Sequence, residues 1–162
     1  FGGQLWKPAA MRLVGSSEAQ GLTGLSTDQL REWTGRRGLI HPDQPAKGKG
    51  TQMRFSWHTL LVLRLASELK TRLHVELHAH RDTFSELQSE FRRTSYISLW
   101  ESAVVLSAPG RLVVTGMANL NLRPEETVVV LPLVPHLRVL TSEFGLHDAM
   151  QQYPLLRPAA VQ

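Results

Sequence analysis

The sequence predicts an α+β protein, with helices in its N-terminal half and strands in its C-terminal half. Two apolar repeats with helical spacing begin just after Ser26 and Ser56, each serine being a suitable helix cap. Three short valine-rich runs between residues 103 and 131 are separated by turn-forming residues, as strands are. At 162 residues the chain is long enough to bury a core without disulfide bonds.

Positive charge is concentrated in the N-terminal half. Residues 1–80 contain 11 Lys and Arg against 6 Asp and Glu, whereas residues 81–162 contain 7 against 8. Clustered cations favour binding to a polyanion such as nucleic acid, and a merely solvated basic face has the same composition. The chain has no cysteine, which excludes disulfides and thiolate catalysis. With no apolar run near the roughly 20 residues of a membrane span, we expect a cytoplasmic protein without a membrane partner.

The clearest local signal is a capping box. Ser26 is followed three residues later by Gln29, a pattern in which each side chain binds the other residue's backbone N–H. We therefore expect a helix over Thr27–Thr34, ended by Gly35 or Gly38. The alternative is an ordinary short surface helix.

A basic loop follows this helix. Leu39–Pro42 is predicted to be a strand, because proline moves the residue before it out of the helical region. Asp43–Gly50 is rich in turn residues, and Thr51–Phe55 is predicted to be the returning strand. Lys47 and Lys49 alternate with glycines, so the backbone there can approach a phosphate. The alternative is a solvated flexible loop.

Further helices are expected over Ser16–Gln20, over residues 56–73 and over Val75–Phe91. The side chains expected to be buried on the last two are Trp57, Leu60, Leu61, Leu65, Leu69, Leu73, Leu77, Phe84, Leu87 and Phe91.

Residues of about 11–75 resemble the DNA-binding domain of the MerR family. The matching positions are Thr23, Gly24, Leu25 and Ser26; Leu30, Arg31 and Trp33; Gly38, Leu39, Ile40 and Pro42; and Arg54, Phe55 and Ser56. The chain has six residues between Arg31 and Gly38 where the family pattern has five, and Thr34 stands in the place of its usual glutamate.

The resemblance implies a winged helix-turn-helix that binds double-stranded DNA, with one helix in the major groove and a basic wing. The side chains implied to face the bases are Thr27, Asp28, Gln29 and Arg31. Those implied to contact phosphates are Arg36, Arg37, Lys47, Lys49 and Arg54. Arg54 has the alternative role of orienting the wing, and Asp28 that of stabilising the helix start. Trp33, Leu39, Phe55 and Trp57 are expected in the core.

The C-terminal half is expected to form a small β-rich module. Strands are predicted over 103–106, 111–115 and 127–131. A turn at residues 107–110 is expected to join the first two, and Pro109-Gly110 suits the centre of a type II turn. A last helix is predicted over Val134–Phe144, broken by Gly145. Valine-rich strands indicate either burial on both faces or a sheet edge that awaits a partner.

The predicted organisation is a DNA-binding domain over 11–75, a connecting helix over 76–93, a β-rich dimerisation or partner-binding module over 94–153, and a loose tail over 154–162.

Metal binding and catalysis have little support. His74 and His78 are four residues apart, so a helix would place both on one face as weak candidates for a zinc site, although solvated histidines give the same pattern. The chain has no phosphate-binding loop, dinucleotide fingerprint or nucleophile elbow. We therefore expect neither a cofactor nor an enzyme activity.

Three functions remain open from the sequence. The first is a sequence-specific, MerR-like transcriptional regulator that acts as a homodimer on double-stranded DNA. The second is a DNA-binding antitoxin whose β-rich half binds a toxin. The third is a protein-interaction module that has kept the fold and lost DNA binding.

Overall fold

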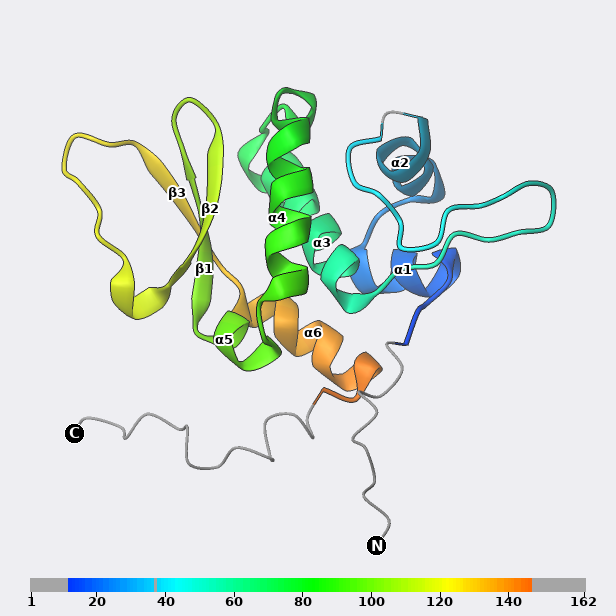
Figure 1. Ribbon diagram of the computed structural model, residues 1–162. Helices are drawn as coiled ribbons and strands as arrows, with labels where there is room; N and C mark the ends of the chain where they lie inside the picture. Colours follow the sequence, from blue (N-terminus) through cyan, green and yellow to red (C-terminus); the bar gives the residue numbers. More distant parts are fainter. Residues whose placement is uncertain (1–11, 37, 147–162) are drawn as a thin grey trace, which may run out of the picture. The chain divides into compact units, whose positions relative to one another are not determined.

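The computed structural model describes residues 12–36 and 38–146 (Figure 1). Within these ranges it contains six α-helices and a three-stranded antiparallel sheet, which confirms the mixed helix-and-sheet class. The chain divides into two compact units, Phe1–Arg81 and Asp82–Gln162, and each is described by itself. The tail expected from residue 154 lies outside the described residues. None of the helices in the described ranges is long and apolar enough to cross a bilayer.

The first unit begins with two short helices joined by a tight turn. Helix α1 (Ser16–Thr23) and helix α2 (Thr27–Arg31) are separated by three residues, of which Gly24 has a left-handed φ of 73°. The capping box is confirmed. Ser26 Oγ accepts a hydrogen bond from Gln29 N at 3.1 Å, and Gln29 Oε1 accepts one from Ser26 N at 3.0 Å.

The expected continuous helix over Thr27–Thr34 is wrong in its second half. After Arg31 the chain forms a π-helical turn, η1 (Glu32–Arg36), whose hydrogen bonds span five residues instead of four. Such a turn contains one residue more than an α-helical turn. It therefore accommodates the sixth residue between Arg31 and Gly38, where the family pattern has five. Gly38 has a φ of 54°, so it is the left-handed glycine after this segment, and Gly35 is not.

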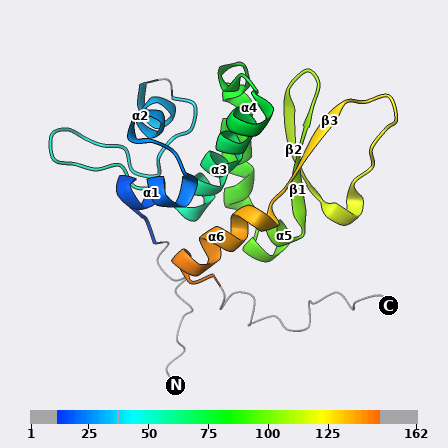
Figure 2. The ribbon, with the colours of Figure 1, turned by 180° about the vertical axis from the view of Figure 1, so that it is seen from behind.

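The loop after Gly38 lacks the two expected strands. Leu39–Pro42 is not a strand, and the only pairing across the loop in the described residues is an isolated bridge between Gln44 and Arg54. A second bridge joins Val14, ahead of α1, to Phe55. Leu39 is 1% exposed, so burial of its side chain and not strand pairing determines this part of the path. Figures 1 and 2 show the loop as an arm that projects beyond α1 and α2.

Helix α3 (Trp57–Leu73) begins after its predicted cap, Ser56, whose Oγ accepts a hydrogen bond from Thr59 N. Its apolar stripe is buried as expected except for Leu73, which is 44% exposed at the last turn. The side chains expected in the core of this unit, Trp33, Leu39, Phe55 and Trp57, are all buried.

The helix expected over Val75–Phe91 is interrupted at its start. His74 ends α3 with a left-handed φ of 52°, a short 3₁₀ turn η2 (Leu77–His80) follows, and α4 (Arg81–Arg93) begins only then. The expected buried side chains are nevertheless confirmed: Leu77, Phe84, Leu87 and Phe91 are each at most 3% exposed.

The second unit contains the sheet and two further helices, α5 (Tyr96–Trp100) and α6 (Val134–Phe144). The strands are β1 (Ser102–Ser107), β2 (Arg111–Gly116) and β3 (Val128–Pro132), in the order β2-β1-β3, with a short 3₁₀ turn η3 (Met117–Asn119) after β2. All three predicted strands and the last helix with its Gly145 stop are confirmed.

The hairpin turn occupies residues 107–110, as expected, but its two central residues are not the expected pair. Gly110 N donates to Ser107 O at 2.7 Å, so the turn is centred on Ala108-Pro109 and not on Pro109-Gly110. In the sheet, Val105 of the central strand β1 pairs with Val113 of β2 and with Val130 of β3. Both β2 and β3 are edge strands, and in β1 only the first three residues are fully buried. Full burial on both faces is therefore wrong.

Candidate nucleic-acid interface

Helix α2 presents a short polar surface. Thr27, Asp28 and Arg31 are exposed, and Gln29 is half-buried. The Thr27 hydroxyl donates to Gln20 Oε1 at 3.1 Å, and the Gln29 side chain is engaged in the capping box. Two of the four side chains expected to face DNA bases therefore have internal partners, and Arg31 is the strongest remaining hydrogen-bond donor of the set.

The loop carries the charge of the candidate interface. Lys47, Lys49 and Arg54 are exposed, as is Arg31 on α2. None of these four cations has an ion-pair partner among the described residues, whereas Arg12, Lys70 and Arg72 are paired with glutamates. Within the described part of the chain, no ion pair therefore neutralises the side-chain charges of this loop.

The base of the loop is anchored to the start of α3. Asp43 Oδ2 accepts hydrogen bonds from Ser56 N at 2.6 Å and from the Thr59 hydroxyl at 2.7 Å. Across the loop, Gln44 and Arg54 exchange two backbone hydrogen bonds of 3.2 and 2.9 Å. The backbone of Arg54 thus orients the loop, while its side chain extends to solvent. The two roles considered for Arg54, orienting the loop and contacting phosphate, are therefore compatible, because they use different parts of the residue.

A single threonine joins α2 to the returning arm of the loop. Thr34, in the π turn, is 5% exposed and donates its hydroxyl to Leu30 O at 2.6 Å. The same hydroxyl lies 3.3 Å from the sulfur of Met53 on the loop. Thr34 thereby holds the π turn that follows α2 against the loop.

The tip of the loop is closed by its own hydrogen bonds. Lys47 N donates to the Thr51 hydroxyl at 2.7 Å, and that hydroxyl donates to Gly48 O at 2.9 Å. Gly48 and Gly50 have φ values of 132° and 91°, a conformation that favours glycine. The tip therefore holds the backbone of both lysines in a compact turn while leaving their side chains in solvent.

A cavity of about 580 Å³ lies between the two arms of the loop. It is lined by Asp43, Gln44, Pro45, Lys47, Thr51, Gln52 and Arg54. Two cations, one carboxylate and several hydrogen-bonding groups therefore border one concave surface. The lining has a small excess of positive charge, which suits a polar, negatively charged group better than an apolar one.

Other arginines of this unit have structural roles that sequence reasoning did not find. Arg81 Nε donates to Gly38 O at 3.1 Å and so holds the chain after the π turn. Arg64 on α3 donates to Leu22 O near the end of α1. Burial lowers the pKa of Arg64, and the charge of Glu68 opposes this. These contacts join residues about forty positions apart, and no local pattern announces them.

The last two residues expected to contact phosphates follow Gly35 in the sequence. Arg36 is the last residue of the π turn η1, and Arg37 lies outside the described residues.

The histidine pair does not form the expected helical face. His74 is the left-handed residue that ends α3, and His78 belongs to the 3₁₀ turn η2. Among residues 12–36 and 38–146, no three His, Asp or Glu side chains are grouped so that they could hold a metal ion.

A comparison with models of known protein families found no match, and a comparison with curated protein sequences found none either. The functional assignment therefore depends on the arrangement of α2 and the loop.

Proposed function

We propose that this protein binds double-stranded DNA through α2 and the loop of residues 44–54, as a MerR-like transcriptional regulator that acts as a dimer. The observation that carries the proposal is the group of four exposed cations, Arg31, Lys47, Lys49 and Arg54, that have no ion-pair partner among the described residues. They lie on a helix and a loop that Thr34 and Met53 hold together.

The loop is suited to the phosphate backbone. Lysine and arginine side chains at phosphates release condensed counterions, which drives affinity without reading sequence. If all four cations reach phosphates, the logarithm of the binding constant should fall with the logarithm of salt concentration with a slope of about −3 to −4. Anchoring by Asp43 reduces the conformational entropy that the loop would otherwise lose on binding, because its base is already ordered.

Helix α2 is suited to sequence discrimination. Arg31 is the exposed donor on α2 that can bind the O6 and N7 atoms of a guanine together. Gln29 could read an adenine only by giving up its bond to Ser26 N, so we assign it to holding the helix start. Asp28 is exposed beside these groups and would repel phosphates, which restricts how α2 can approach the duplex.

The direct test is selection of bound fragments from a random duplex pool, followed by the same selection with Arg31→Ala. We expect an enriched sequence for the unmodified protein. In the variant, preference at one guanine position should weaken by about 1 to 3 kcal/mol, while affinity for unrelated duplexes changes little.

The matched control is Arg72→Ala, which removes an exposed arginine that is paired with Glu68 on α3. It should leave the selected sequence unchanged. No binding to any duplex at low salt would contradict the proposal and favour the interaction module. An Arg31→Ala protein with unaltered preference would show that α2 does not read the bases.

A further inference from the structure

Strand β2 has an open edge. In the order β2-β1-β3 it pairs only with β1, and in the described part of the chain the backbone hydrogen bonds of residues 111–116 go to no other segment. Every second residue of an antiparallel strand directs its N–H and C=O away from its neighbour. Such an unpaired row on an apolar strand is a template for a further strand.

The opposite edge is less suitable. Strand β3 ends at Pro132, which has no N–H to donate and is exposed. Strand β2 contains no proline, and its only charged residue is Arg111 at the turn end. Of the two edges, β2 is therefore the one that its sequence leaves competent to pair.

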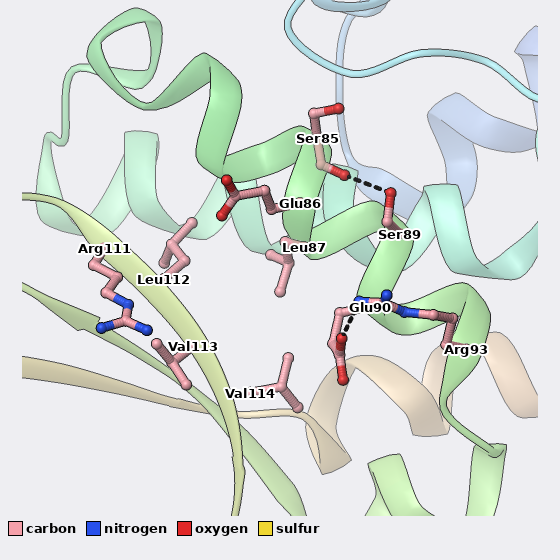
Figure 3. Close-up of a pocket in the computed structure, with 10 residues that line it drawn as sticks. All are labelled: Ser85, Glu86, Leu87, Ser89, Glu90, Arg93, Arg111, Leu112, Val113 and Val114. Atoms are coloured by element: carbon pink, nitrogen blue, oxygen red, sulfur yellow. Dashed lines mark hydrogen bonds and ion pairs between the residues drawn. The ribbon is translucent and has the colours of Figure 1, made fainter.

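A groove runs along this edge. Figure 3 shows it between α4 and β2, with Leu87 and Leu112 on its two walls. Its volume is about 630 Å³, and four consecutive β2 residues, Arg111 to Val114, line it. Because consecutive residues point to opposite faces of a sheet, a cavity bordered by all four is bounded by the strand's edge. Open space thus lies beside the unpaired backbone.

The charges around the groove balance. Two acids, Glu86 and Glu90, and two bases, Arg93 and Arg111, line it, and Arg93 Nη2 lies 2.6 Å from Glu90 Oε2. A strongly charged peptide would find no complementary surface here. A second copy of this chain carries the same two acids and two bases on its own groove. Its approach therefore adds no net charge to the interface, and no net repulsion opposes it.

We infer that the occupant is β2 of a second copy of this chain. The two β2 strands pair antiparallel about a two-fold axis, which joins both sheets into one of six strands. The inference deepens the proposed function by naming the dimer interface, and it rests on that proposal only for the expectation of a dimer.

Symmetry restricts the register of this pairing. Cross-strand partners point to the same face of a sheet, so a strand that pairs with its own copy must centre on one residue that faces itself. Val113 lies mid-strand and is 40% exposed, more than is usual for a packed valine. Centred there, the register pairs Arg111 with Thr115 and Leu112 with Val114.

The first test is the mass of the full chain by light scattering at micromolar concentration, without DNA. We expect twice the 18.2 kDa chain mass. Val113→Lys places two ammonium groups opposite each other across the axis and should weaken the dimer about tenfold or more. The matched control is Val139→Lys on α6, which alters a valine of similar exposure, 37%, and should leave the dimer intact.

The second test uses charge pairing. Val113→Glu alone should weaken the dimer by a similar factor, whereas an equal mixture of the Val113→Lys and Val113→Glu chains should recover its affinity, because lysine then faces glutamate. Native mass spectrometry distinguishes this mixed dimer by its mass. A general loss of folding cannot produce such recovery, so the mixture keeps the inference testable even if each variant is less stable.

Three results would overturn the inference: an unmodified chain that stays at the monomer mass, a dimer dissociation constant that Val113→Lys leaves unchanged, or a mixture that associates no more tightly than either variant alone. Because no DNA is present, these outcomes are independent of the proposed DNA binding. A dimer that binds no duplex would leave this interface standing and reject only the proposed function.

Discussion

Replacing both loop lysines by alanine is the sharpest test of the basic loop. Lys47 and Lys49 are exposed, have no ion-pair partner among the described residues, and contribute only Lys47 N to the hydrogen bonding of the tip. The double variant Lys47→Ala/Lys49→Ala keeps that backbone bond, so it removes charge without removing packing. We expect its thermal unfolding midpoint to equal that of the unmodified protein.

The expected loss of affinity depends on salt in a defined way. Each phosphate contact contributes about 0.9 to the slope of log K against log salt concentration, so two lost contacts reduce the slope by about 2. Relative to 1 M salt, the same two contacts are worth roughly 60-fold in affinity at 0.1 M and roughly ninefold at 0.3 M. The ratio of the affinity loss at 0.1 M salt to that at 0.3 M salt therefore tests for phosphate contacts as directly as either loss alone.

Fluorescence anisotropy of a labelled duplex, titrated at several salt concentrations, measures both quantities. The control is Lys70→Ala/Arg72→Ala on α3, which removes the same charge from two cations that are already paired with Glu76 and Glu68. A loss equal in the two double variants would show that net charge and not the loop matters. A loss that does not vary with salt would show that the lysines do not contact phosphates.

Two predictions concern stability, one for each unit. Asp43→Ala should lower the free energy of unfolding of the first unit by about 2 kcal/mol in denaturant titrations, because the partly buried N–H of Ser56 and hydroxyl of Thr59 lose their shared acceptor. Burial raises the pKa of Tyr96, an effect that its hydrogen bond to Thr141 opposes. The unfolded chain therefore loses the phenol proton first, and stability should fall as pH rises from about 10 through the folded pKa. Tyr96→Phe should show a shallower decline in unfolding midpoint over that range.

Each of these has a result that would contradict it. For the loop anchor, the control is Asp28→Ala, which removes an exposed carboxylate that has no side-chain hydrogen bond among the described residues. Equal losses in the two variants would remove the special role of Asp43. For the tyrosine, identical pH dependence in the unmodified protein and in Tyr96→Phe would show that the ring oxygen is not desolvated by folding.

The sequence predicted correctly those elements that are stabilised by interactions between residues close together in the chain. The capping box at Ser26 and the glycine stop at Gly145 each act within a few residues, and both are found where expected. The three valine-rich strands are also where expected, because short β-branched runs bounded by turn residues define them without reference to the rest of the chain.

Tertiary contacts determined what the sequence did not reveal. Leu39 and Ile40 have the composition of a strand but bury their side chains in the core, where no neighbouring strand is available to pair with them. No local pattern in the sequence predicted the π turn η1. The sequence marks Asp43 only as a turn residue, because its hydrogen-bond partners lie thirteen and sixteen positions away. In the candidate interface, the cations were predictable from composition, and the anchors that position them were not.

Among the described residues, hydrogen bonds attach the loop of residues 44–54 to the rest of the first unit only at its two ends. Its ends are held by Asp43 on one side and by Met53 and the Arg54 backbone on the other. Insertions or deletions between Pro45 and Gly50 should therefore leave α2 and α3 unchanged. Among the described residues, neither helix forms a hydrogen bond with that stretch. Engineered versions of the chain would therefore change how far Lys47 and Lys49 extend from α2 by loop length alone, while the fold that carries them stays the same.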